Sequence, residues 1–251
     1  MSPADPQPLR EKERPVVSVV LPTFNERENI VLLVEELRSR FRSALHSYEI
    51  IIVDDQSPDG TGEAVSVAFG DDPNVRLIVR RERPGLAFSI REGIERSTGS
   101  IIVVMDTDFN HKPSDAVILF EIARQVDLAI GSRFIFGGGM RSLLRYYLSY
   151  LYNIFLRLIL GTRIDENLSG FFAIKREHMF ALEFDKIFWG YGDYFFRLLL
   201  LSQRGHFRHV EVPISYGARL GGNSKTQLLR VFSKYTGAVF YVLYLKALGR
   251  W

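Results

Sequence analysis

The first half of the sequence contains five apolar runs of strand length, separated by segments with helical periodicity. The runs do not alternate with polar residues, and this pattern is typical of strands that are covered on both faces. Between the first two runs, apolar residues recur at the three- and four-residue spacing of one helix face. This order predicts an α/β fold with an open, mostly parallel sheet flanked by helices. The runs are residues 16–21, 49–53, 75–79, 101–105 and 128–130.

The length and composition are those of a globular chain with one main domain. The chain has 251 residues, of which 47% are hydrophobic and 24% charged, and such values are typical of folded domains. It contains no cysteine, so disulfides and thiol chemistry are excluded. Residues 1–15 are polar and contain proline. We interpret them as a flexible tail and not as a signal peptide, because they lack an apolar stretch.

Charge is divided unevenly along the chain. The formal net charge is −7 up to Ile130 and +10 from Gly131 onward, so the two halves are expected to have different roles. Carboxylates suit metal coordination, whereas basic residues suit phosphate groups or an anionic membrane surface. We do not expect nucleic acid as a partner, because the basic residues are interleaved with aliphatic and aromatic runs instead of forming a polar stripe.

Polar and acidic residues follow three of the apolar runs. Residues 22–26 follow the first run, Asp54 and Asp55 the second, and Asp106 and Asp108 the fourth. The carboxyl ends of parallel strands meet at one edge of a sheet, where ligands bind. Paired carboxylates there suit a hard cation that completes its shell with phosphate oxygens, which favours group transfer from a nucleotide-activated donor. Solvated acids in ordinary turns would give the same local pattern. Neither a dinucleotide-binding glycine motif nor a P-loop is present.

Seven short motifs occur in one order between about residue 16 and residue 233. They are Pro22-Thr23-Phe24-Asn25-Glu26-Arg27-Glu28-Asn29, Val53-Asp54-Asp55, Gly85-Leu86-Ala87, Asp106-Thr107-Asp108, Gly131-Ser132-Arg133-Phe134, Ser169-Gly170-Phe171 and Val212-Pro213-Ile214. Each is weak alone, and their joint occurrence is specific. The chain resembles the inverting GT-A glycosyltransferases of family 2. Within that family it is most similar to the polyprenyl (dolichyl) phosphate mannosyltransferases, or dolichol-phosphate hexose synthases.

The resemblance implies a donor site and a metal site in the acidic half. Asp106 and Asp108, with Asn110 where the family often has glutamine, match the ligands of Mg²⁺ or Mn²⁺. GDP-mannose is the favoured donor, and UDP-glucose or a UDP-N-acetylhexosamine is the alternative, because relatives with this scaffold use each. The residues that match the donor-binding positions are Pro22, Thr23, Asn25, Glu26, Asp54, Asp55 and Asp106.

The resemblance also implies an acceptor site for a polyprenyl or dolichyl phosphate in the basic half. Residues 219–225 are similar to the family motif Arg-x-x-Gly-x-Ser-Lys, with Asn223 where glutamate is common. Arginine, serine and lysine supply donors for phosphate oxygens, although a flexible basic surface loop would have the same composition. The residues expected at the acceptor phosphate are Arg133, Arg145, Arg219, Ser224 and Lys225, and those expected to be catalytic are Asp106, Asp108, Arg133 and Arg219.

The nature of the acceptor decides whether a general base is needed. A phosphate monoester, with a second pKa of about 6, is mostly dianionic at neutral pH, so its oxygen attacks the anomeric carbon without a base. In relatives that use a sugar acceptor, an acid near the position of Asp193 is the base. Asp193 therefore keeps a polysaccharide or glycan synthase as the alternative function. A catalytically silent scaffold subunit is disfavoured, because Asp106 and Asp108 are both present.

Two apolar segments of the basic half suit a membrane surface. Residues 143–160 are interrupted by Arg145 and Arg157, and only eleven uncharged residues separate Lys234 from Lys246. Both segments are shorter than the roughly 20 residues that span a bilayer. We expect peripheral binding at the cytoplasmic face of a membrane. Alternatively, the helices pack in the core or in a dimer interface, or the last one docks on a small membrane-protein anchor.

These expectations divide the chain into three parts. Residues 1–15 are the tail, 16–225 the catalytic domain and 226–251 a C-terminal amphipathic helix. Within the catalytic domain, 16–131 would hold the nucleotide-sugar and the metal. Residues 132–225 would hold the acceptor and include an interfacial helix at 142–160.

Overall fold

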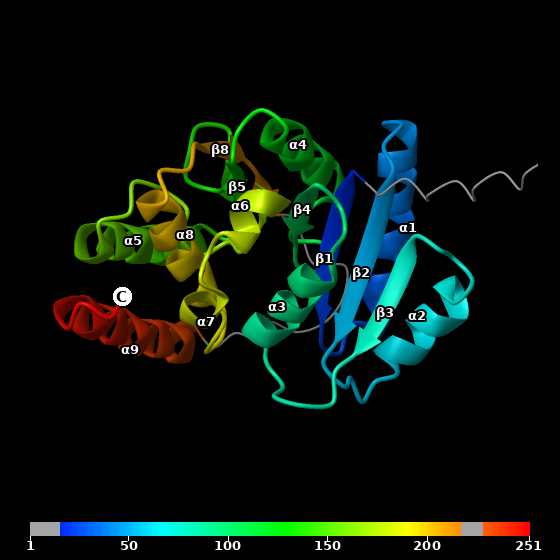
Figure 1. Cartoon of the computed structure of the whole chain (residues 1–251), viewed down its shortest axis with the longest axis horizontal. Helices are drawn as coiled ribbons and strands as arrows, with labels where there is room; N and C mark the ends of the chain where they lie inside the picture. The colour runs from blue at the N-terminus through cyan, green and yellow to red at the C-terminus, as the bar shows by residue number, and fades with distance from the viewer. Residues whose placement is uncertain (1–15, 217–227) are drawn as a thin grey trace, which may run out of the picture.

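A seven-stranded sheet forms the centre of the computed structural model, which describes residues 16–216 and 228–251 (Figure 1). The strand order is β3-β2-β1-β4-β7-β5-β8. Strand β7 is antiparallel to its neighbours β4 and β5, and the other neighbouring pairs are parallel. The predicted open, mostly parallel sheet is therefore confirmed. The strands are β1 (Val17–Thr23), β2 (Tyr48–Asp54), β3 (Val75–Val79), β4 (Ile101–Val104), β5 (Leu128–Ser132), β7 (Phe172–Lys175) and β8 (His209–Pro213).

Alternate residues of the central strands face two separate apolar cores, one on each side of the sheet. In β1, Val19 and Leu21 belong to one core, and Val20 belongs to the other. Successive side chains of a strand point to opposite faces, so both faces of β1 are buried. This double coverage explains why the strands appear in the sequence as continuous apolar runs.

Helices cover both faces of the sheet. The core that contains Val19 packs against α1 (Arg27–Ser43), α2 (Thr61–Phe69) and α4 (Pro113–Ala123). The core that contains Val20 packs against α3 (Leu86–Arg96) and α8 (Tyr194–Arg204), with the short helices α6 (Arg176–Phe180) and α7 (Phe184–Ile187) beside it. Figure 1 shows α1 and α2 at the β3 end of the molecule and the C-terminal elements at the opposite end.

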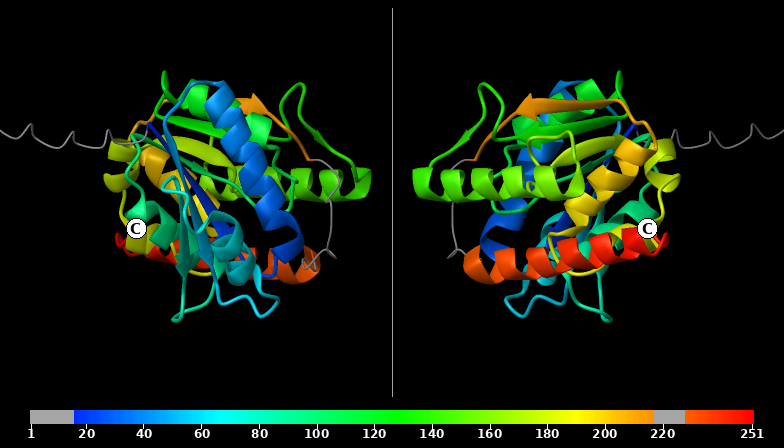
Figure 2. Two further views of the ribbon diagram at one scale, coloured as in Figure 1. Left: turned by 90° about the vertical axis from the view of Figure 1, so that its right-hand side faces the viewer. Right: turned by 90° about the vertical axis from the view of Figure 1, so that its left-hand side faces the viewer.

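Two long helices, α5 (Leu143–Leu160) and α9 (Leu228–Ala247), lie side by side (Figure 2), at the end of the molecule that is remote from β3 (Figure 1). The Tyr152 ring of α5 stacks on the Phe232 ring of α9 with centroids 4.5 Å apart, and its hydroxyl lies 3.0 Å from the Thr236 hydroxyl. A second, two-stranded parallel sheet, β6 (Gly139–Met140) with β9 (Ser215–Tyr216), lies near the start of α5. No described helix is long and apolar enough to cross a membrane.

Helix α5 presents both buried and exposed apolar residues. Leu156 is fully buried and Leu160 nearly so, and both belong to the core on the α3 side of the sheet. Eight of its other apolar residues are exposed: Leu143, Leu144, Tyr147, Leu148, Tyr150, Leu151, Leu158 and Ile159. In α9 and just after it, Phe240, Tyr241, Tyr244 and Leu248 are exposed. Each helix therefore packs against the molecule with one face and leaves a second apolar face in contact with solvent.

Candidate active site

Two cavities meet at the carboxyl ends of β1 and β4. The first, which we call the strand-end cavity, has a volume of about 440 Å³, and the second, the α5 cavity, about 370 Å³. Leu86, Asp106 and Tyr191 line both cavities. Asp106 therefore lies on the shared wall, where it can contact ligands bound on either side.

The strand-end cavity is formed by the loops that follow three parallel strands. Pro22, Thr23 and Glu26 line it from the end of β1, and Asp55 lines it from the end of β2. These residues come together because the register of β1 on β2 places Thr23 opposite Asp54. The remaining lining residues are Phe24, Pro84, Gly85, Leu86, Ser89, Asp106, Thr107, Asp108 and Tyr191.

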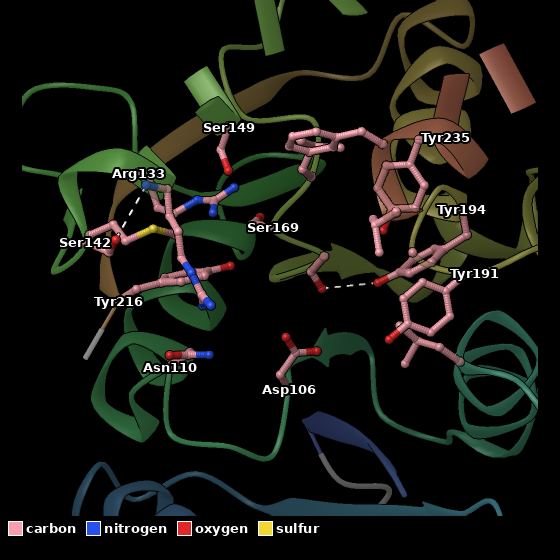
Figure 3. Close-up of a pocket in the computed structure, with 18 of the residues that line it drawn as sticks. Asp106, Asn110, Arg133, Ser142, Ser149, Ser169, Tyr191, Tyr194, Tyr216 and Tyr235 are labelled. Carbon is pink, nitrogen blue, oxygen red and sulfur yellow. Dashed lines mark hydrogen bonds between the residues drawn. The ribbon is translucent and has the colours of Figure 1, made fainter. Parts of the chain in front are cut away.

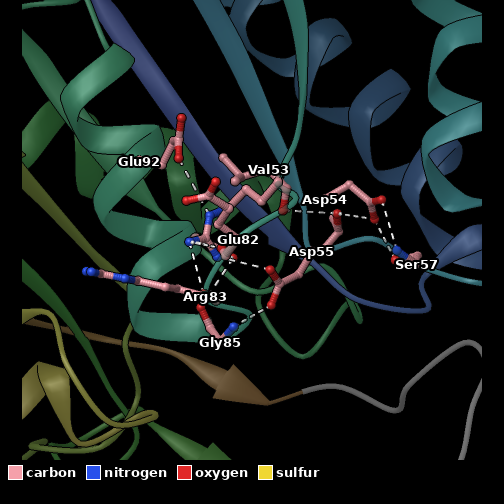
Figure 4. Close-up of polar contacts among 11 residues, drawn as sticks. Val53, Asp54, Asp55, Ser57, Glu82, Arg83, Gly85 and Glu92 are labelled. Atoms are coloured by element: carbon pink, nitrogen blue, oxygen red, sulfur yellow. Dashed lines mark hydrogen bonds and ion pairs between the residues drawn. The ribbon is translucent and has the colours of Figure 1, made fainter.

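The two carboxylates at the end of β2 have different environments (Figure 4). Asp54 is buried, accepts hydrogen bonds from the Ser57 backbone and hydroxyl, and does not line the cavity. Asp55 lines the cavity, pairs with Arg80 at 3.0 Å and accepts from the Gly85 N–H at 2.5 Å. Asp54 thus orders the loop after β2, and Asp55 fixes the loop that precedes α3.

Asn25 belongs to the loop between β1 and α1 and does not line the strand-end cavity. Its backbone has φ of 56° and its N–H donates to the Ser57 hydroxyl at 2.9 Å. Asparagine tolerates this left-handed conformation better than most residues. Asn25 therefore shapes the loop that carries the neighbouring cavity residue Glu26.

The loop between β4 and α4 carries three oxygen-bearing side chains at the junction of the cavities. Asp106 faces both cavities, Asp108 the strand-end cavity and Asn110 the α5 cavity. Asn110 donates to Asp108 from its backbone at 3.1 Å and from its side-chain amide at 2.8 Å. Within the described residues no three His, Cys, Asp or Glu side chains converge as a metal site.

This loop nevertheless fits a divalent cation of the Mg²⁺ type. Such ions take oxygen ligands, keep few protein carboxylates and complete their shell with water and substrate phosphate. Asp106 and Asp108 supply two carboxylates beside a cavity large enough for a ligand, and the Asn110 amide contributes a further oxygen. The donor set is therefore chemically suited to Mg²⁺ or Mn²⁺ bound together with a phosphate group.

Arginine and hydroxyl side chains line one side of the α5 cavity (Figure 3). Arg133 follows directly from β5 and pairs with the buried Glu166 in bidentate geometry, at 2.7 and 2.8 Å. Burial by itself lowers the pKa of Arg133, but the Glu166 carboxylate outweighs it and the pKa lies above its ordinary value. The guanidinium is thus a permanent positive charge whose Nε–H and one Nη–H are held by Glu166.

The start of α5 contributes three more lining residues. The helix is preceded by Arg141 and Ser142, and its first turn contains Arg145. The Ser142 hydroxyl caps the helix by accepting a hydrogen bond from the Arg145 N–H. The cavity therefore has three guanidinium groups on its wall, which suits an anionic ligand. Arg219, Ser224 and Lys225 lie outside the described residues. Tyr216 and Val231, which flank that segment, both line the α5 cavity.

Four tyrosines contribute to the α5 cavity, and none of them was singled out from the sequence. Figure 3 shows Tyr191, Tyr194 and Tyr235 on the side opposite Arg133, and Tyr216 on the same side as Arg133. The Tyr194 hydroxyl donates to the Gly170 carbonyl at 3.3 Å. The four tyrosines lie just before α8, at its start, in β9 and in α9, so only the tertiary fold brings them together.

His111 is a further residue that was not found from the sequence. It is buried, accepts from the Asp106 N–H through Nδ1 at 2.9 Å, and has Nε2 2.9 Å from the Tyr216 hydroxyl. Burial, with the charge of Arg133, lowers the pKa of His111 to about 3, so the ring is neutral at neutral pH. Its partner Tyr216 is 105 residues away in the sequence, and no local pattern could have shown the contact.

Asp193, the base expected of a sugar-acceptor enzyme, is an ion-paired buried residue. Its carboxylate pairs with Arg197 and accepts from the Tyr191 N–H at 2.6 Å. Arg197 is fully buried and also donates to the Ile187 and Trp189 carbonyls. Asp193 lines neither cavity. Its contacts therefore position the segment around Tyr191, and its carboxylate is not directed at a ligand site.

Residues 18–180 match the family model described as glycosyl transferase family 2. Curated relatives match over most of the chain. A dolichol-phosphate mannosyltransferase of Pyrococcus furiosus is 35% identical over 94% of this chain and 64% of its own length. An undecaprenyl-phosphate mannosyltransferase of Micrococcus luteus is 34% identical over 83% of this chain and 86% of its own length. A polyprenol monophosphomannose synthase of Mycolicibacterium smegmatis is 34% identical, with 88% and 84% covered.

Solved structures share the fold. Glucosyl-3-phosphoglycerate synthase from Mycobacterium tuberculosis, in complex with Mn²⁺, UDP and phosphoglyceric acid, superposes with a TM-score of 0.67. The match has 21% sequence identity and covers 90% of this chain and 77% of that one. The same synthase with Mg²⁺ and UDP gives a TM-score of 0.65 at 21% identity, with 90% and 78% covered. At this identity the likeness concerns the fold alone.

Proposed function

The chain belongs to glycosyl transferase family 2, and we propose that it transfers a hexose, with inversion, from a nucleotide-sugar to a polyprenyl or dolichyl phosphate. Mannose is the proposed sugar, because the three relatives are named as mannosyltransferases or as a monophosphomannose synthase. GDP-mannose is the proposed donor. The chain spans 64% of the length of the Pyrococcus furiosus relative. The activity of that longer protein is therefore extended to this chain only as a proposal, which is argued from the two cavities.

The observation that carries the proposal is the junction of two unlike cavities at Asp106. One cavity is lined by carboxylates from three strand ends, and the other by three arginines at the start of α5 and the end of β5. Transfer requires the donor and the acceptor to meet at one point in a near-attack geometry. A nucleotide-sugar in the strand-end cavity and a phosphate in the α5 cavity would meet at this shared wall.

In the proposed donor site, the side chains at the end of β1 and Asp55 would contact the nucleotide. Asp54 and Asn25 would act indirectly, because their contacts order the two loops that form the cavity. Asp106, Asp108 and Asn110 would hold Mg²⁺ or Mn²⁺ with the diphosphate. A cation bound there would neutralise the negative charge that develops on the leaving nucleoside diphosphate.

In the proposed acceptor site, Arg133 and Arg145 would face the lipid phosphate. Tyr216 and Val231, which flank residues 217–230 in the sequence, both line the cavity, and this supports a role for Arg219, Ser224 and Lys225 at the same phosphate. The acceptor oxygen would form a bond to the anomeric carbon as the bond to the diphosphate breaks and its electron pair leaves with the nucleotide. The dianionic acceptor gives up no proton, so no base is required.

A phosphate acceptor also agrees with the environment of Asp193. Asp193, which matches the base of the sugar-acceptor relatives, is paired with Arg197 and lines neither cavity of the described structure. A sugar hydroxyl would need a base within hydrogen-bond reach. The contacts of Asp193 therefore favour the lipid phosphate over a glycan hydroxyl.

The exposed apolar face of α5 suits a membrane surface beside the acceptor site. Leu144 and Leu151 are 72% and 61% exposed on the helix whose first turn carries Arg145. Apolar side chains in the acyl boundary and arginines at anionic headgroups are the features of an interfacial helix. We propose that the enzyme binds peripherally, at the cytoplasmic face, with α5 in contact with the lipid surface.

The reaction is tested with a donor panel. Purified protein is given a short polyprenyl phosphate, Mg²⁺ or Mn²⁺, and GDP-mannose, UDP-glucose or UDP-N-acetylglucosamine, and the lipid product is identified by mass. We expect a polyprenyl phosphate that gains one hexose from GDP-mannose. Product only with a glycan acceptor would contradict the proposal.

Membrane binding is tested with anionic liposomes. We expect the wild type to sediment with them at low salt and to be released at high salt, because screening weakens headgroup attraction. Leu144→Ser with Leu151→Ser should reduce sedimentation, whereas the control Leu32→Ser, 60% exposed on α1, should not. Leu156 is unsuitable for this test because it is buried in the core. Equal sedimentation of all variants would exclude α5 as the binding face.

A further inference from the structure

A chain of buried contacts joins the Asp106 loop to the arginine side of the α5 cavity. The Asp106 N–H donates to His111 Nδ1 at 2.9 Å, and His111 Nε2 lies 2.9 Å from the Tyr216 hydroxyl. The Tyr216 ring lies 4.6 Å from the Arg133 guanidinium carbon. Phe171 stacks on the His111 ring, with centroids 4.4 Å apart and 14° between the planes. The position of the Tyr216 hydroxyl is therefore fixed by the protein before any ligand binds.

The Asp106 backbone determines which nitrogen of His111 carries the proton. An N–H that points at Nδ1 requires a lone pair there, so the neutral ring holds its proton on Nε2. Nε2–H then donates to the Tyr216 oxygen. The stacking on Phe171 and the burial of the ring prevent it from turning to exchange the two nitrogens.

A phenol oxygen that accepts from His111 directs its own proton elsewhere. Tyr216 lines the α5 cavity, and Figure 3 shows its hydroxyl directed to the cavity interior, between Arg133 and Asp106. Within residues 16–216 and 228–251, the contact with His111 is the one hydrogen bond of this hydroxyl. Burial raises the pKa of the Tyr216 phenol, so the group keeps its proton. The cavity therefore contains a neutral, pre-oriented hydrogen-bond donor.

We propose that Tyr216 binds substrate by donating this hydrogen bond to a phosphoryl oxygen of the acceptor, and that His111 is the positioning residue that orients the proton. The inference rests on the proposed function, because the acceptor phosphate brings the anionic oxygen into the α5 cavity. Tyr216 lines this cavity and not the strand-end cavity, which assigns it to the acceptor and not to the donor diphosphate. Glu166 holds two nitrogens of the neighbouring Arg133, so a second donor at this point complements the guanidinium.

Tyr216→Phe removes the hydroxyl and retains the ring beside Arg133. A hydrogen bond to a charged oxygen corresponds to about a tenfold change in affinity or more, so we expect the KM for a polyprenyl phosphate to rise about tenfold. The KM for the nucleotide-sugar should stay within about twofold. The control is Tyr152→Phe, because that hydroxyl is bonded to Thr236 and lies outside both cavities. A rise in the donor KM alone would assign Tyr216 to the donor and overturn the inference.

Two His111 variants separate positioning from packing. His111→Phe retains an aromatic ring on Phe171 and removes both hydrogen bonds, and it should raise the acceptor KM as Tyr216→Phe does. His111→Gln offers an amide that can accept and donate at once, and it should restore most of the acceptor affinity. In the double variant His111→Phe with Tyr216→Phe, the acceptor KM should equal that of Tyr216→Phe alone, because both changes act through one hydroxyl. Additive effects would overturn the positioning role.

Direct binding distinguishes this inference from the proposed function. Calorimetric titration with farnesyl phosphate should show about tenfold weaker binding to Tyr216→Phe than to the wild type. If the wild type makes the lipid-linked product and both proteins bind farnesyl phosphate equally, the inference fails and the function stands. If the wild type makes no such product from any donor, the proposed function fails. The titration then still decides whether Tyr216 binds a phosphate monoester.

Discussion

The two cavities that meet at Asp106 are built in different ways. The strand-end cavity is formed mainly by loops that directly follow β1, β2 and β4, and Asp108 is bonded to Asn110 of its own loop. The α5 cavity combines Arg133, which follows β5, with side chains from α5, β9, α9 and the start of α8. Adjacent parallel strands bring their ends together as a consequence of pairing. The α5 cavity depends instead on contacts between elements that are distant in the sequence.

This difference predicts which properties each cavity controls. Changes in the strand-end cavity should affect the donor, the metal and turnover. Changes around the α5 cavity should affect either the acceptor or the stability of the elements that form it. The four predictions below test this division, beginning with the largest expected effect.

Asp108→Asn should lower kcat/KM by about 100- to 1,000-fold, because the metal loop loses a carboxylate that would hold the divalent cation, and this cation would offset the negative charge of the leaving diphosphate. Steady-state kinetics with a thermal melt as a folding check would measure this, and chelation of the metal should have a similar effect on the wild type. The control Asp115→Asn changes an acid of α4 that lines neither cavity. Activity of Asp108→Asn within a few-fold of the wild type would contradict the metal assignment.

Asp193→Asn should destabilise the fold by about 3 kcal/mol or more, because it leaves the buried Arg197 without its carboxylate. Below the melting temperature, kcat should remain within a few-fold of the wild type. Chemical denaturation and turnover measured on the same preparation separate the two effects. If this variant does not fold, Asp193→Asn with Arg197→Met removes both partners and permits the same assay. A large loss of kcat in a folded protein would favour a glycan acceptor.

Asp127 lies directly before β5, at the amino-terminal ends of the parallel strands and thus opposite the strand-end cavity. Burial by itself raises the pKa of Asp127, but hydrogen bonds from Arg208 outweigh it and lower the pKa to about 2. Because this pKa is lower in the folded than in the unfolded protein, the ionised Asp127 carboxylate stabilises the fold above pH 4. The stabilisation is lost as the pH falls from about 4 to 2. We expect Asp127→Asn to cost about 2 kcal/mol at pH 7 and about half as much at pH 3. Denaturation at both pH values measures this.

Asp127→Asn also tests whether the two cavities are independent of a charge at the amino-terminal ends of the strands. Kinetic constants at pH 7 should be unchanged in Asp127→Asn, because its carboxylate lies outside the cavities. A changed KM for either substrate would show that the opposite edge of the sheet is coupled to the site.

Arg145→Ala should raise the KM for polyprenyl phosphate by about five- to tenfold and leave the donor KM unchanged, because an exposed arginine of the proposed phosphate site is lost. The matched control is Arg157→Ala on the same helix, whose guanidinium pairs with Asp165 and does not line the cavity. Equal acceptor KM values for the two variants would remove Arg145 from the acceptor site. A changed donor KM would contradict the separation of the two cavities.

The sequence alone determined five strands of the sheet and the site at their carboxyl ends. Continuous apolar runs predicted β1 to β5, because residues covered on both faces leave no polar alternation. The positions of Asp55, Asp106 and Asp108 after those runs predicted their convergence, and all three line the strand-end cavity. The family was likewise predicted from the order of short motifs, and the match of residues 18–180 confirms it.

The tertiary structure alone decided the α5 cavity. The insertion of antiparallel β7 between β4 and β5 was not predicted, and it separates two strands that are consecutive in the sequence. The contacts of Arg133 with Glu166 and of His111 with Tyr216 join residues 33 and 105 positions apart. Hydrophobic periodicity reports which face of an element is buried and not which distant side chain it meets. The partners of these buried polar groups are therefore set by packing across the whole chain, where each group must find a hydrogen bond.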